Sequence, residues 1–553
     1  MIDCVLVGFN DYSFDDYIES LRVMGREAVS YRDANLSFID RGGERLRALD
    51  ILNKHGIFTG ENEQPLDNSD FIWPVITYLG SYLARHGLTF DYIRLFHRDK
   101  DRLAALLRSK NTRSIAITTT VYVTPEPIVE IVEFVREVDP EVKIIIGGPF
   151  LADKSKTMTA TSLQDLLEYL GADFYVFSAE GEGALKELIS ALKNGTEVES
   201  VSNIAFRKGD SFVTNLIVQE FNSLEDNMVD YRLFSRRDIG QFVSVRTAKS
   251  CPFACAFCGF PERAGRYKYL SLDYVEKELD AIRDVGGVTT ITFIDDTFNV
   301  PKGRFKEMLR LMIRKQYGFR WNSYLRSDHV DEEALELMAQ SGCEGVFLGV
   351  ESGSGKILQN MAKASRPSDY RWVIDRCRAL GIVTYASMIV GFPGEDQTTV
   401  QESIDFLDSS RPNFYRAQVW YADPITPIYR NGGMYSLKGE GFAWSHETMT
   451  AFEAADIVEK MFLTVKGSRW LPQNGFEPWS LYYLQRRGMK FEHICRFLDS
   501  FNDAVAEKLR TGHEEASDAR FEELVRVAKG EALDERLIEK NCRVIPDATH
   551  PHL

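Results

Sequence analysis

The sequence predicts an α/β protein in which an N-terminal parallel sheet is followed by a partial (β/α)6 barrel and a helical C-terminal domain. Two observations support this fold class. Unbroken β-branched runs that end near glycine alternate with amphipathic helical patterns in two separate stretches of the chain, as expected of parallel sheets buried on both faces. After residue 440 the pattern becomes mainly helical. A chain of 553 residues is also too long for one compact core.

These patterns divide the chain into four segments. We expect a Rossmann-like sheet domain over residues 1–200, a polar linker over 201–240, a barrel over 241–430, and a mainly helical C-terminal domain over 431–553, with an irregular tail from 541.

The first segment alternates apolar runs with helical spacing. Its predicted strands are 5–8, 114–120, 143–148 and 172–177, and its helices 71–86 and 127–138, with a polar, insertion-like stretch over 33–70. Ligands of parallel sheets bind at the carboxyl ends of the strands. Several of those ends carry glycine, which lets a flat ligand lie against the backbone, although tight turns without a ligand explain the glycines equally well.

The third segment contains six predicted strand–helix units, which indicates a parallel barrel with its active groups on the carboxyl-terminal rim. The strands are 242–247, 288–294, 319–324, 344–350, 382–390 and 414–421, and the helices 271–285, 302–316, 331–341, 367–380 and 396–409. Four further helices are predicted beyond the barrel, at 448–465, 478–487, 490–508 and 517–529.

Charge and composition exclude some classes of function. With 66 basic and 82 acidic side chains the net charge is −16, which disfavours sequence-independent nucleic-acid binding. The first residues contain no basic region and no signal-length apolar core, and no stretch reaches the length of a transmembrane helix, so we expect a cytoplasmic protein without a membrane partner. Eight cysteines in so long a chain do not indicate a disulfide framework.

Three of these cysteines, Cys251, Cys255 and Cys258, form a C-x3-C-x2-C array directly after the first barrel strand. Three thiolates can hold three corners of a 4Fe-4S cluster and leave the fourth iron open to another ligand. A zinc site would need a fourth Cys or His nearby, and the nearest histidine is His329. A disulfide would leave one cysteine unpaired. The array therefore favours a catalytic iron–sulfur cluster bound by these three cysteines.

This loop at the start of a βα barrel resembles the radical S-adenosylmethionine (SAM) superfamily, in which SAM binds the open iron and is cleaved to a 5′-deoxyadenosyl radical. The resemblance covers about residues 240–430. It implies that Arg326 meets the SAM carboxylate and that Glu351 accepts hydrogen bonds from the ribose, although Glu351 read alone could be a helix cap. The full set of implied SAM contacts is Phe257, Asp295, Asp296, Arg326, Glu351, Ser352 and Gly391.

A Rossmann-like sheet ahead of such a barrel is similar to the cobalamin-binding class of this superfamily. The first loop, residues 8–13, contains no D-x-H-x-x-G motif, so no histidine is offered there as a cobalt ligand. The residues that the resemblance places at the cobalamin are Phe9, Asn10, Thr118, Thr119, Thr120, Gly147, Gly148, Glu180, Gly181 and Glu182.

Within this class the chain resembles the PhpK-type P-methyltransferases of phosphinothricin-like pathways. The supporting phrases are residues 246–253, 256–261, 414–424 and 470–476. The resemblance implies a natural-product methyltransferase that moves a methyl group from methylcobalamin to an unactivated P or C centre of a small, phosphinate-like precursor. It also implies an electron donor such as a flavodoxin or ferredoxin. The substrate-binding candidates are Arg416, Gln418, Tyr421 and Asp423.

Two other functions stay open at this point. A cobalamin-binding radical SAM enzyme could carry out rearrangement, epimerisation or alkyl transfer without methylation. A non-catalytic iron–sulfur protein is the third reading, but it leaves the segments around Arg326 and Glu351 without a role.

Overall fold

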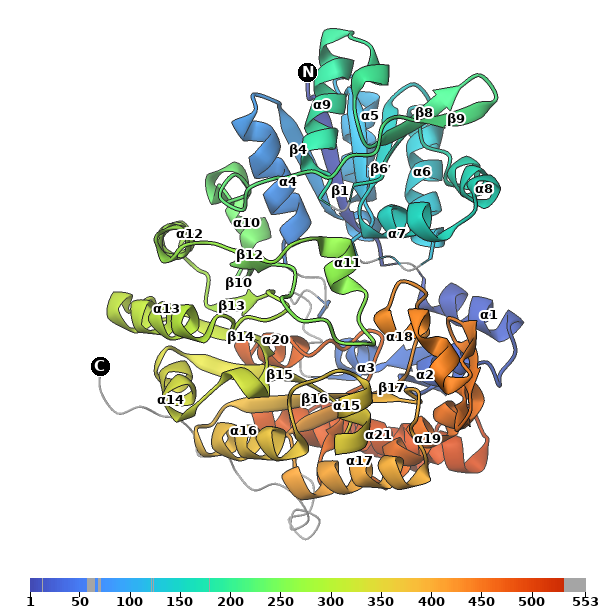
Figure 1. The fold of residues 1–553 in the computed structure, drawn as a ribbon, viewed down its shortest axis with the longest axis vertical. Coiled ribbons are helices and arrows are strands. Elements are labelled where there is room, and N and C mark those ends of the chain that lie inside the picture. Colours follow the sequence, from blue (N-terminus) through green and yellow to red (C-terminus); the bar gives the residue numbers. More distant parts are fainter. Residues whose placement is uncertain are drawn as a thin grey trace. The chain divides into compact units, whose positions relative to one another are not determined.

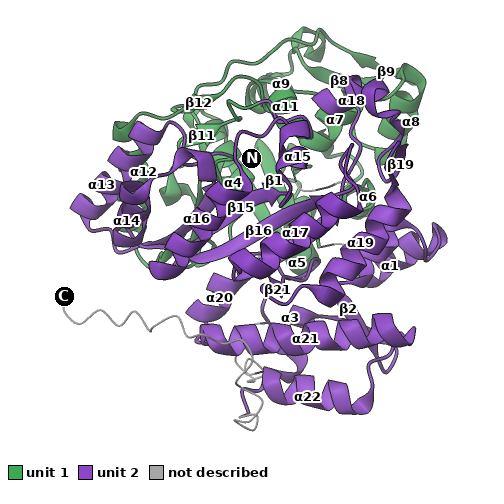
Figure 2. Ribbon diagram, turned by 60° about the horizontal axis from the view of Figure 1, so that its bottom comes forward, with its two compact units in different colours: residues 1–14, 71–253, 259–296 green, residues 15–70, 254–258, 297–553 purple. Residues whose placement is uncertain are grey.

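The computed structural model describes residues 1–11, 13–56, 65–67, 71–120, 122, 124–178 and 180–531 (Figure 1). The chain divides into two compact units, drawn in different colours in Figure 2. Unit 1 comprises residues 1–14, 71–253 and 259–296, and unit 2 comprises residues 15–70, 254–258 and 297–553. The predicted tail from residue 541 lies outside the described residues.

Unit 1 is built on a sheet with the strand order β4-β1-β5-β6-β7-β8-β9. Its first five strands are parallel: β4 (Phe90–Leu95), β1 (Cys4–Phe9), β5 (Ser114–Thr118), β6 (Lys143–Gly147) and β7 (Phe174–Val176). The four strands predicted in this segment are confirmed, and β4 is an additional one. The antiparallel hairpin of β8 (Ile204–Lys208) and β9 (Ser211–Thr214) extends the sheet from the segment that was expected to be a linker.

Helices between these strands bury apolar faces against the sheet. They are α4 (Pro74–Arg85), α5 (Phe96–Arg108), α6 (Glu126–Val138), α7 (Pro149–Thr157), α8 (Ala160–Leu170) and α9 (Glu182–Asn194). In α6 the apolar residues at helical spacing, Ile128, Ile131, Val132 and Val135, are all buried in one core with strand residues such as Ile115.

The remainder of unit 1 contains the start of the predicted barrel. Strand β10 (Phe242–Val245) pairs in parallel with β13 (Thr290–Phe293), and α12 (Leu272–Val285) lies between them in the sequence. The short strands β11 (Ala248–Lys249) and β12 (Lys268–Tyr269) pair with each other, and α11 (Phe260–Ala264) separates them.

Unit 2 contains a second parallel arrangement, in the strand order β14-β15-β16-β17-β21. The strands are β14 (Arg320–Leu325), β15 (Cys343–Glu351), β16 (Val383–Val390), β17 (Phe414–Val419) and β21 (Arg469–Trp470). Four of them match predicted barrel strands, and β21 is an additional one. The intervening helices are α13 (Lys302–Lys315), α14 (Glu332–Gln340), α15 (Gly355–Asn360), α16 (Pro367–Ala379) and α17 (Gln397–Ser410).

The C-terminal part of unit 2 is mainly helical, as predicted. It contains α19 (Ala451–Thr464), α20 (Ser480–Arg486), α21 (Phe491–Thr511) and α22 (Asp518–Ala528), preceded by a small sheet of β18 (Lys438–Glu440), β19 (Ala443–His446) and β20 (Met449–Thr450).

The polar stretch near the N-terminus folds into unit 2, although both its flanks belong to unit 1. Its elements are α1 (Phe14–Val23), α2 (Val29–Asn35), the hairpin of β2 (Phe38–Arg41) and β3 (Glu44–Arg47), and α3 (Ala48–His55). Helix α2 packs against α19 and β17, and β2 packs against α21. The buried Lys508 of α21 donates hydrogen bonds to the carbonyls of Asn35 and Phe38, at 2.7 and 2.6 Å. This insertion is therefore held on the end of β17.

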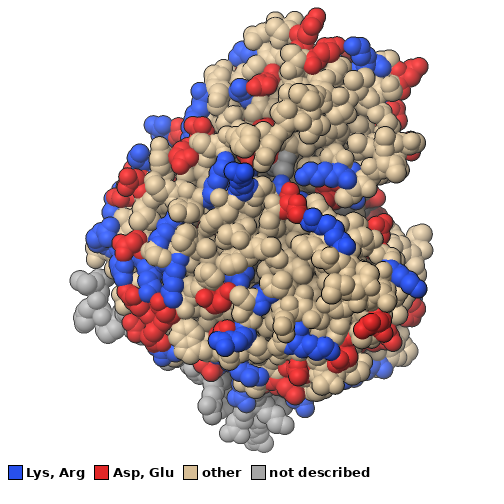
Figure 3. Space-filling view, viewed as in Figure 1, with Lys and Arg blue, Asp and Glu red and all other residues tan. Residues whose placement is uncertain are grey.

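No helix in the described ranges is long and apolar enough to cross a membrane. Figure 3 shows one face of the molecule, on which acidic and basic side chains are interspersed. Although the net charge is −16, that face therefore shows no single dominant patch of acidic side chains.

Candidate functional site

The cysteine loop runs from β11 to α11, with its ends held by backbone contacts. Ser250 has a positive φ of 67°, and its hydroxyl donates to the carbonyl of Gly265 at 2.6 Å. In the middle of the loop, the N–H of Ala256 donates to Met361 at 2.8 Å and the carbonyl of Ala256 accepts from Ile428 at 2.9 Å. Two distant segments of unit 2 thus fix the backbone between Cys255 and Cys258.

None of the seven cysteines that the structure describes forms a disulfide, so the disulfide alternative is wrong for them. Within the same residues, no three His, Cys, Asp or Glu side chains are gathered as a set that could hold a metal ion. The loop thus supplies three thiols of the kind that bind iron–sulfur clusters, without their being drawn together around one point. Whether Cys251, Cys255 and Cys258 are cluster ligands stays a prediction.

Two buried cations of unit 2 lie at Cys255. Burial lowers the pKa of Arg326, but the neighbouring Asp328 carboxylate and, after it, the Cys255 sulfur raise this pKa above its ordinary value. The Lys363 ammonium also interacts electrostatically with Cys255. It lies 5.8 Å from the ring centre of Phe257. Two cationic side chains of unit 2 therefore lie near the Cys255 sulfur.

Arg326 is held rigidly at the end of β14. Its Nε and Nη2 donate to the Asp328 carboxylate at 3.0 and 2.9 Å, a bidentate pair. The side chain of the buried Asn299 clamps the Arg326 backbone, accepting from its N–H at 3.0 Å and donating to its carbonyl at 2.8 Å. The contact of Arg326 with the SAM carboxylate stays a prediction.

Glu351 closes β15 in a left-handed conformation, with φ of 64°. Its Oε1 accepts from Lys363 Nζ at 3.0 Å, and both side chains are about nine-tenths buried, at 11% and 8% exposed. Lys363 also donates to the carbonyl of Gly349, which accepts from the Tyr370 hydroxyl at 2.8 Å. A side chain at position 349 would collide with the Glu351 carboxylate. Glu351 is therefore one half of a buried ion pair, not a helix cap.

Asp295 has a different role from the one that the resemblance implies. Its carboxylate accepts from the N–H groups of Thr247 and Ala248 at 2.6 and 2.9 Å and from the Thr247 hydroxyl. The residue is 1% exposed. It fixes the backbone just ahead of the cysteine loop, whereas the neighbouring Asp296 is exposed. Of this pair, Asp296 has the carboxylate that a ligand can reach.

Ser352 and Gly391 are packed inside unit 2. The Ser352 hydroxyl lies 3.2 Å from that of Ser403 and accepts from the Ser354 N–H at 3.1 Å. Gly391 has φ of 88°, and a Cβ there would come within 2.5 Å of the Trp444 ring. The Gly391 N–H donates to the Glu395 carboxylate at 2.5 Å, and the Ser352 N–H donates to the Val350 carbonyl at 2.9 Å. These positions therefore shape the strand ends.

The carboxyl ends of the unit 1 strands carry the predicted cobalamin residues, and several are already engaged. Asn10 donates its N–H to the Tyr122 oxygen at 2.7 Å and its side-chain amide to Pro127 and Glu130. Gly148 has φ of 119°, and a Cβ there would lie 2.8 Å from the Thr119 hydroxyl. Thr118 and Thr120 place their hydroxyls side by side, 2.9 Å apart, at the same edge. Thr118, Thr120 and the half-buried Phe9 are the members best placed for a ligand.

The acidic residues after β7 are bound within unit 1. Glu180 forms an ion pair with Lys249 and accepts from the N–H of Asn222 at 3.1 Å. Glu182 accepts from the side chains of Asn222 and Asn227, and burial raises its pKa to about 7. Gly181 is the left-handed residue that starts α9, with φ of 67°. These glutamates therefore tie the sheet to the segment before β10.

The substrate candidates fall on two faces of unit 2. Arg416 and Gln418 lie on one face of β17, because both are half-buried while their neighbours in the strand are buried. Tyr421 is 54% exposed and meets the edge of Phe442. The Asp423 carboxylate accepts from the Ile425 N–H at 3.1 Å, which makes it a turn residue. Arg416 and Gln418 are thus the pair that shares a surface.

Sequence reasoning missed the partners of the predicted residues. Lys363 and Asp328 carry the charges opposite Glu351 and Arg326, and Asn299 clamps the β14 end. Asp328 lies two positions after Arg326, a spacing that could have indicated the pair, whereas Lys363 and Asn299 carry no recognisable pattern.

Comparison with protein families identifies the central part of the chain. Residues 245–407 match the model of the radical SAM superfamily, from β10 to α17. This stretch is a radical SAM domain. It contains the three cysteines, Arg326, Glu351 and Lys363.

Among curated proteins, an uncharacterized methyltransferase of Pyrococcus horikoshii is 25% identical over 282 residues, which cover 50% of this chain and 60% of that protein. One similar solved structure is that of TsrM from Kitasatospora setae, a radical SAM methyltransferase, with cobalamin and a 4Fe-4S cluster bound. Its TM-score is 0.55 at 17% sequence identity, and the match covers 85% of this chain and 83% of TsrM. The cobalamin-dependent radical enzyme OxsB has a TM-score of 0.54 at 15% identity, covering 95% of this chain and 70% of OxsB. The likeness to both structures is one of fold.

Proposed function

We propose that the protein is a cobalamin-dependent radical SAM methyltransferase that acts on a small natural-product precursor. The observation that carries this proposal is the arrangement around Cys255 inside the radical SAM domain. Arg326 and Lys363, two mostly buried cations, lie beside a thiol of the three-cysteine loop, and Lys363 is paired with Glu351. An anionic cluster, a carboxylate and ribose hydroxyls are the groups that such a site would attract.

The chain's own residues would act by binding and orienting. Cys251, Cys255 and Cys258 would hold the cluster, Arg326 would bind the SAM carboxylate, and Glu351 would hold the ribose. When bound, the cluster and SAM would supply the 5′-deoxyadenosyl radical, and cobalamin would supply the methyl group. A flavodoxin or ferredoxin would deliver the reducing electron.

Cobalamin is proposed from the parallel sheet of unit 1 and from the folds of TsrM and OxsB, which were solved with it. The paired hydroxyls of Thr118 and Thr120 and the half-buried ring of Phe9 suit a flat, polar-edged ligand at the strand ends. Asn10, Thr119, Glu180 and Glu182 are hydrogen-bonded within unit 1, so these four residues hold the strand ends in place.

The methyl acceptor is proposed to be an unactivated P or C centre, phosphinate-like by the resemblance of the sequence. The guanidinium of Arg416 suits a phosphinate or carboxylate group. The chain spans about half to three-fifths of the curated relatives that it matches, and their activities are not carried over.

The cofactor content of the full chain tests this function. The protein is purified without oxygen, supplied with iron, sulfide and hydroxocobalamin, and freed of unbound material. We expect a corrin absorbance beside that of the cluster. The variant Thr118→Leu should lower corrin retention at unchanged iron content, whereas the exposed Thr214→Leu on β9 should not. Retention of iron without any corrin would reject methyl transfer in favour of other radical SAM chemistry.

A further inference from the structure

The face of β17 that carries Arg416 contains charged groups that the radical SAM chemistry does not use. The Nε and Nη2 atoms of Arg416 are buried and have no hydrogen-bond acceptor. The nearest carboxylate oxygen, Oδ2 of Asp33, lies 3.8 Å from Nη2, which is too far for a hydrogen bond. A buried guanidinium edge without acceptors is costly, and it has the geometry that binds a carboxylate through two parallel bonds.

A second carboxylate lies within the electrostatic reach of the same guanidinium. Glu477, ahead of α20, is half-buried, and its pKa is raised by burial while the Arg416 charge opposes the rise. Asp33 is in the same situation. With Asp33, Glu477 and Arg416 ionised, the cluster carries one positive and two negative charges. An anionic ligand alone would meet two carboxylates, and a cationic ligand alone would leave the Arg416 donors unsatisfied.

Aromatic rings continue this surface across the neighbouring strands. Tyr324 on β14 pairs in register with Phe347 on β15, which pairs with Tyr385 on β16. The ring centres are 5.5 Å apart for the first pair and 6.1 Å for the second. Tyr385 lies two positions before Ser387, the register partner of Arg416, so the row ends on the same face as Arg416. Tyr385 also lies within the electrostatic reach of Arg416, Glu477 and Glu351.

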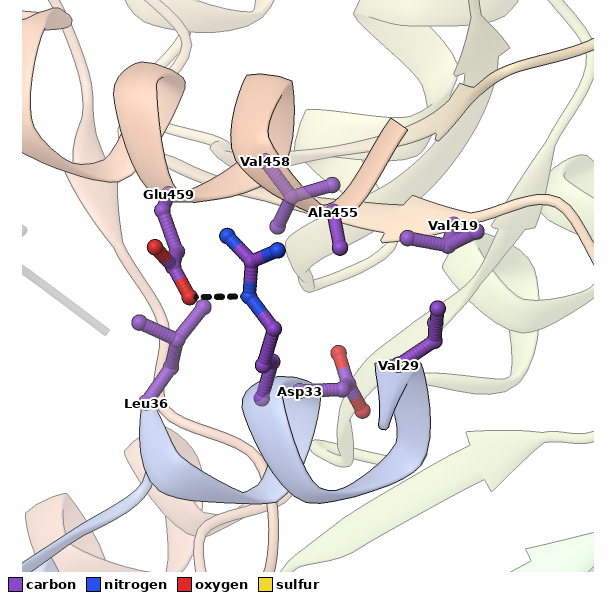
Figure 4. A pocket seen from close by; sticks show the side chains of 8 residues that line it. Val29, Asp33, Leu36, Val419, Ala455, Val458 and Glu459 are labelled. Atoms are coloured by element: carbon purple, nitrogen blue, oxygen red, sulfur yellow. Dashed lines mark hydrogen bonds and ion pairs between the residues drawn. The ribbon is translucent and has the colours of Figure 1, made fainter. Parts of the chain in front are cut away.

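The insertion supplies Asp33 and is locked in place next to β17. Figure 4 shows the small pocket between α2, α19 and Val419 at the end of β17, lined by Asp33 among others. Arg32, the residue before Asp33, forms ion pairs with Glu459 at 2.8 Å and Asp456 at 2.7 Å on α19. These ion pairs hold α2 against α19, and they thereby hold the Asp33 carboxylate in place beside Arg416.

We propose that this surface binds the head group of an α-amino acid with an apolar, flat side chain. Arg416 takes the carboxylate, Asp33 and Glu477 take the ammonium group, and the row Tyr324–Phe347–Tyr385 takes the side chain. Such a ligand gives each charged group of the cluster an oppositely charged partner. The inference rests on the proposed function, because it takes this strand face as the acceptor site. It assigns the acceptor to the amino acids, with a carbon centre in place of the phosphinate that the sequence resemblance implies.

Calorimetry on the full chain, loaded with its cofactors and kept without oxygen, tests the head-group assignment. The probes are L-phenylalanine, N-acetyl-L-phenylalanine, phenethylamine and L-alanine. They remove in turn the ammonium charge, the carboxylate and the aromatic side chain. We expect L-phenylalanine to bind at least tenfold more tightly than each of the other three. Equal binding of N-acetyl-L-phenylalanine, or no heat from any probe at millimolar concentration, would overturn the proposal.

Variants locate the binding surface. Arg416→Gln and Arg416→Lys should each weaken L-phenylalanine at least tenfold, since lysine keeps the charge but loses the two-donor edge. Glu477→Gln should weaken L-phenylalanine more than its N-acetyl derivative. The control is Arg232→Gln, whose side chain is 88% exposed. Unchanged binding in a folded Arg416→Lys protein would contradict the assignment. The heat of binding does not depend on SAM cleavage. The binding result can therefore be interpreted even if the protein shows no methyltransferase activity.

Discussion

The ammonium of Lys363 lies 3.0 Å from Oε1 of Glu351, and both side chains are about nine-tenths buried at the end of β15. The same ammonium reaches the Gly349 carbonyl and lies over the ring of Phe257 in the cysteine loop. Lys363 therefore connects the strand end that carries Glu351 with the loop that carries Cys255 and Cys258. This connection explains how the predicted SAM residues are held before any ligand arrives.

Replacing Lys363 with methionine should lower the free energy of unfolding by about 3 kcal/mol, because it leaves a buried carboxylate without its partner. The double variant Lys363→Met/Glu351→Gln should recover much of that loss without recovering SAM affinity. Denaturant unfolding and SAM binding measure the two effects. The exposed pair of Lys356 with Asp396 provides the control, since Lys356→Met should change stability by less than about 1 kcal/mol. A single variant at Lys363 as stable as the wild type would contradict the buried pair.

Each of the substitutions Cys251→Ala, Cys255→Ala and Cys258→Ala should abolish most of the bound iron after anaerobic reconstitution. A cubane cluster has four irons, so three thiolates leave one iron open and the loss of any of them removes a protein ligand. Cys377→Ala, in the buried face of α16, is the matched control and should keep its iron. Iron and sulfide analysis gives the answer, and wild-type iron content in any of the three loop variants would remove that cysteine from the cluster.

Asp295→Ala should destabilise unit 1 by about 2 kcal/mol or more, because it leaves the N–H groups of Thr247 and Ala248 without their acceptor. Asp295→Asn should cost much less, since the amide oxygen can accept both bonds and the amide nitrogen can donate to the Thr247 hydroxyl. Thermal unfolding distinguishes this role from a SAM contact. A charge-dependent SAM contact would instead make Asp295→Asn weaken SAM binding at unchanged stability.

Glu278 of α12 makes stability depend on pH. Burial raises its pKa to about 8 from an ordinary value of 4.5, with Arg246 opposing and Asp295 reinforcing the shift. The folded protein therefore holds a proton that the unfolded chain has lost between these two values. The contribution of this group to the free energy of unfolding is fully present below about pH 4.5 and is lost as the pH rises towards about 8. The pH profile of unfolding should become flatter in Glu278→Gln than in the wild type, whereas the exposed Glu336→Gln should leave it unchanged. Parallel profiles for wild type and Glu278→Gln would contradict the assignment.

The fold could be predicted from the sequence wherever hydrophobic periodicity was strong. The six barrel strands and the four C-terminal helices lie within a few residues of their predicted bounds. The strand β4 was missed because Phe90–Leu95 is interrupted by Asp91 and Arg94. The two residues of β21 carry too little pattern to be recognised. Nothing in the residues indicated that the insertion before Phe71 packs with the C-terminal helices, since that depends on contacts such as Lys508 with Asn35.

The candidate site could be predicted as positions at strand ends, but not as interactions. A motif indicates that Arg326 and Glu351 follow successive strands, whereas it cannot indicate that Asp328 and Lys363 neutralise them. The reverse holds for Asp295, whose place after β13 suggested a ligand contact although its carboxylate binds the backbone of Thr247 and Ala248. The partners of a side chain depend on tertiary packing, and a short sequence motif does not contain that information.

The products formed from SAM test the central claim most directly. The full chain, loaded with cluster and cobalamin and supplied with a chemical reductant, is incubated without oxygen with SAM and the candidate acceptor. We predict that S-adenosylhomocysteine and 5′-deoxyadenosine both form, and that their amounts rise together when the acceptor is added. Formation of 5′-deoxyadenosine alone would contradict methyl transfer and would support radical chemistry without methylation.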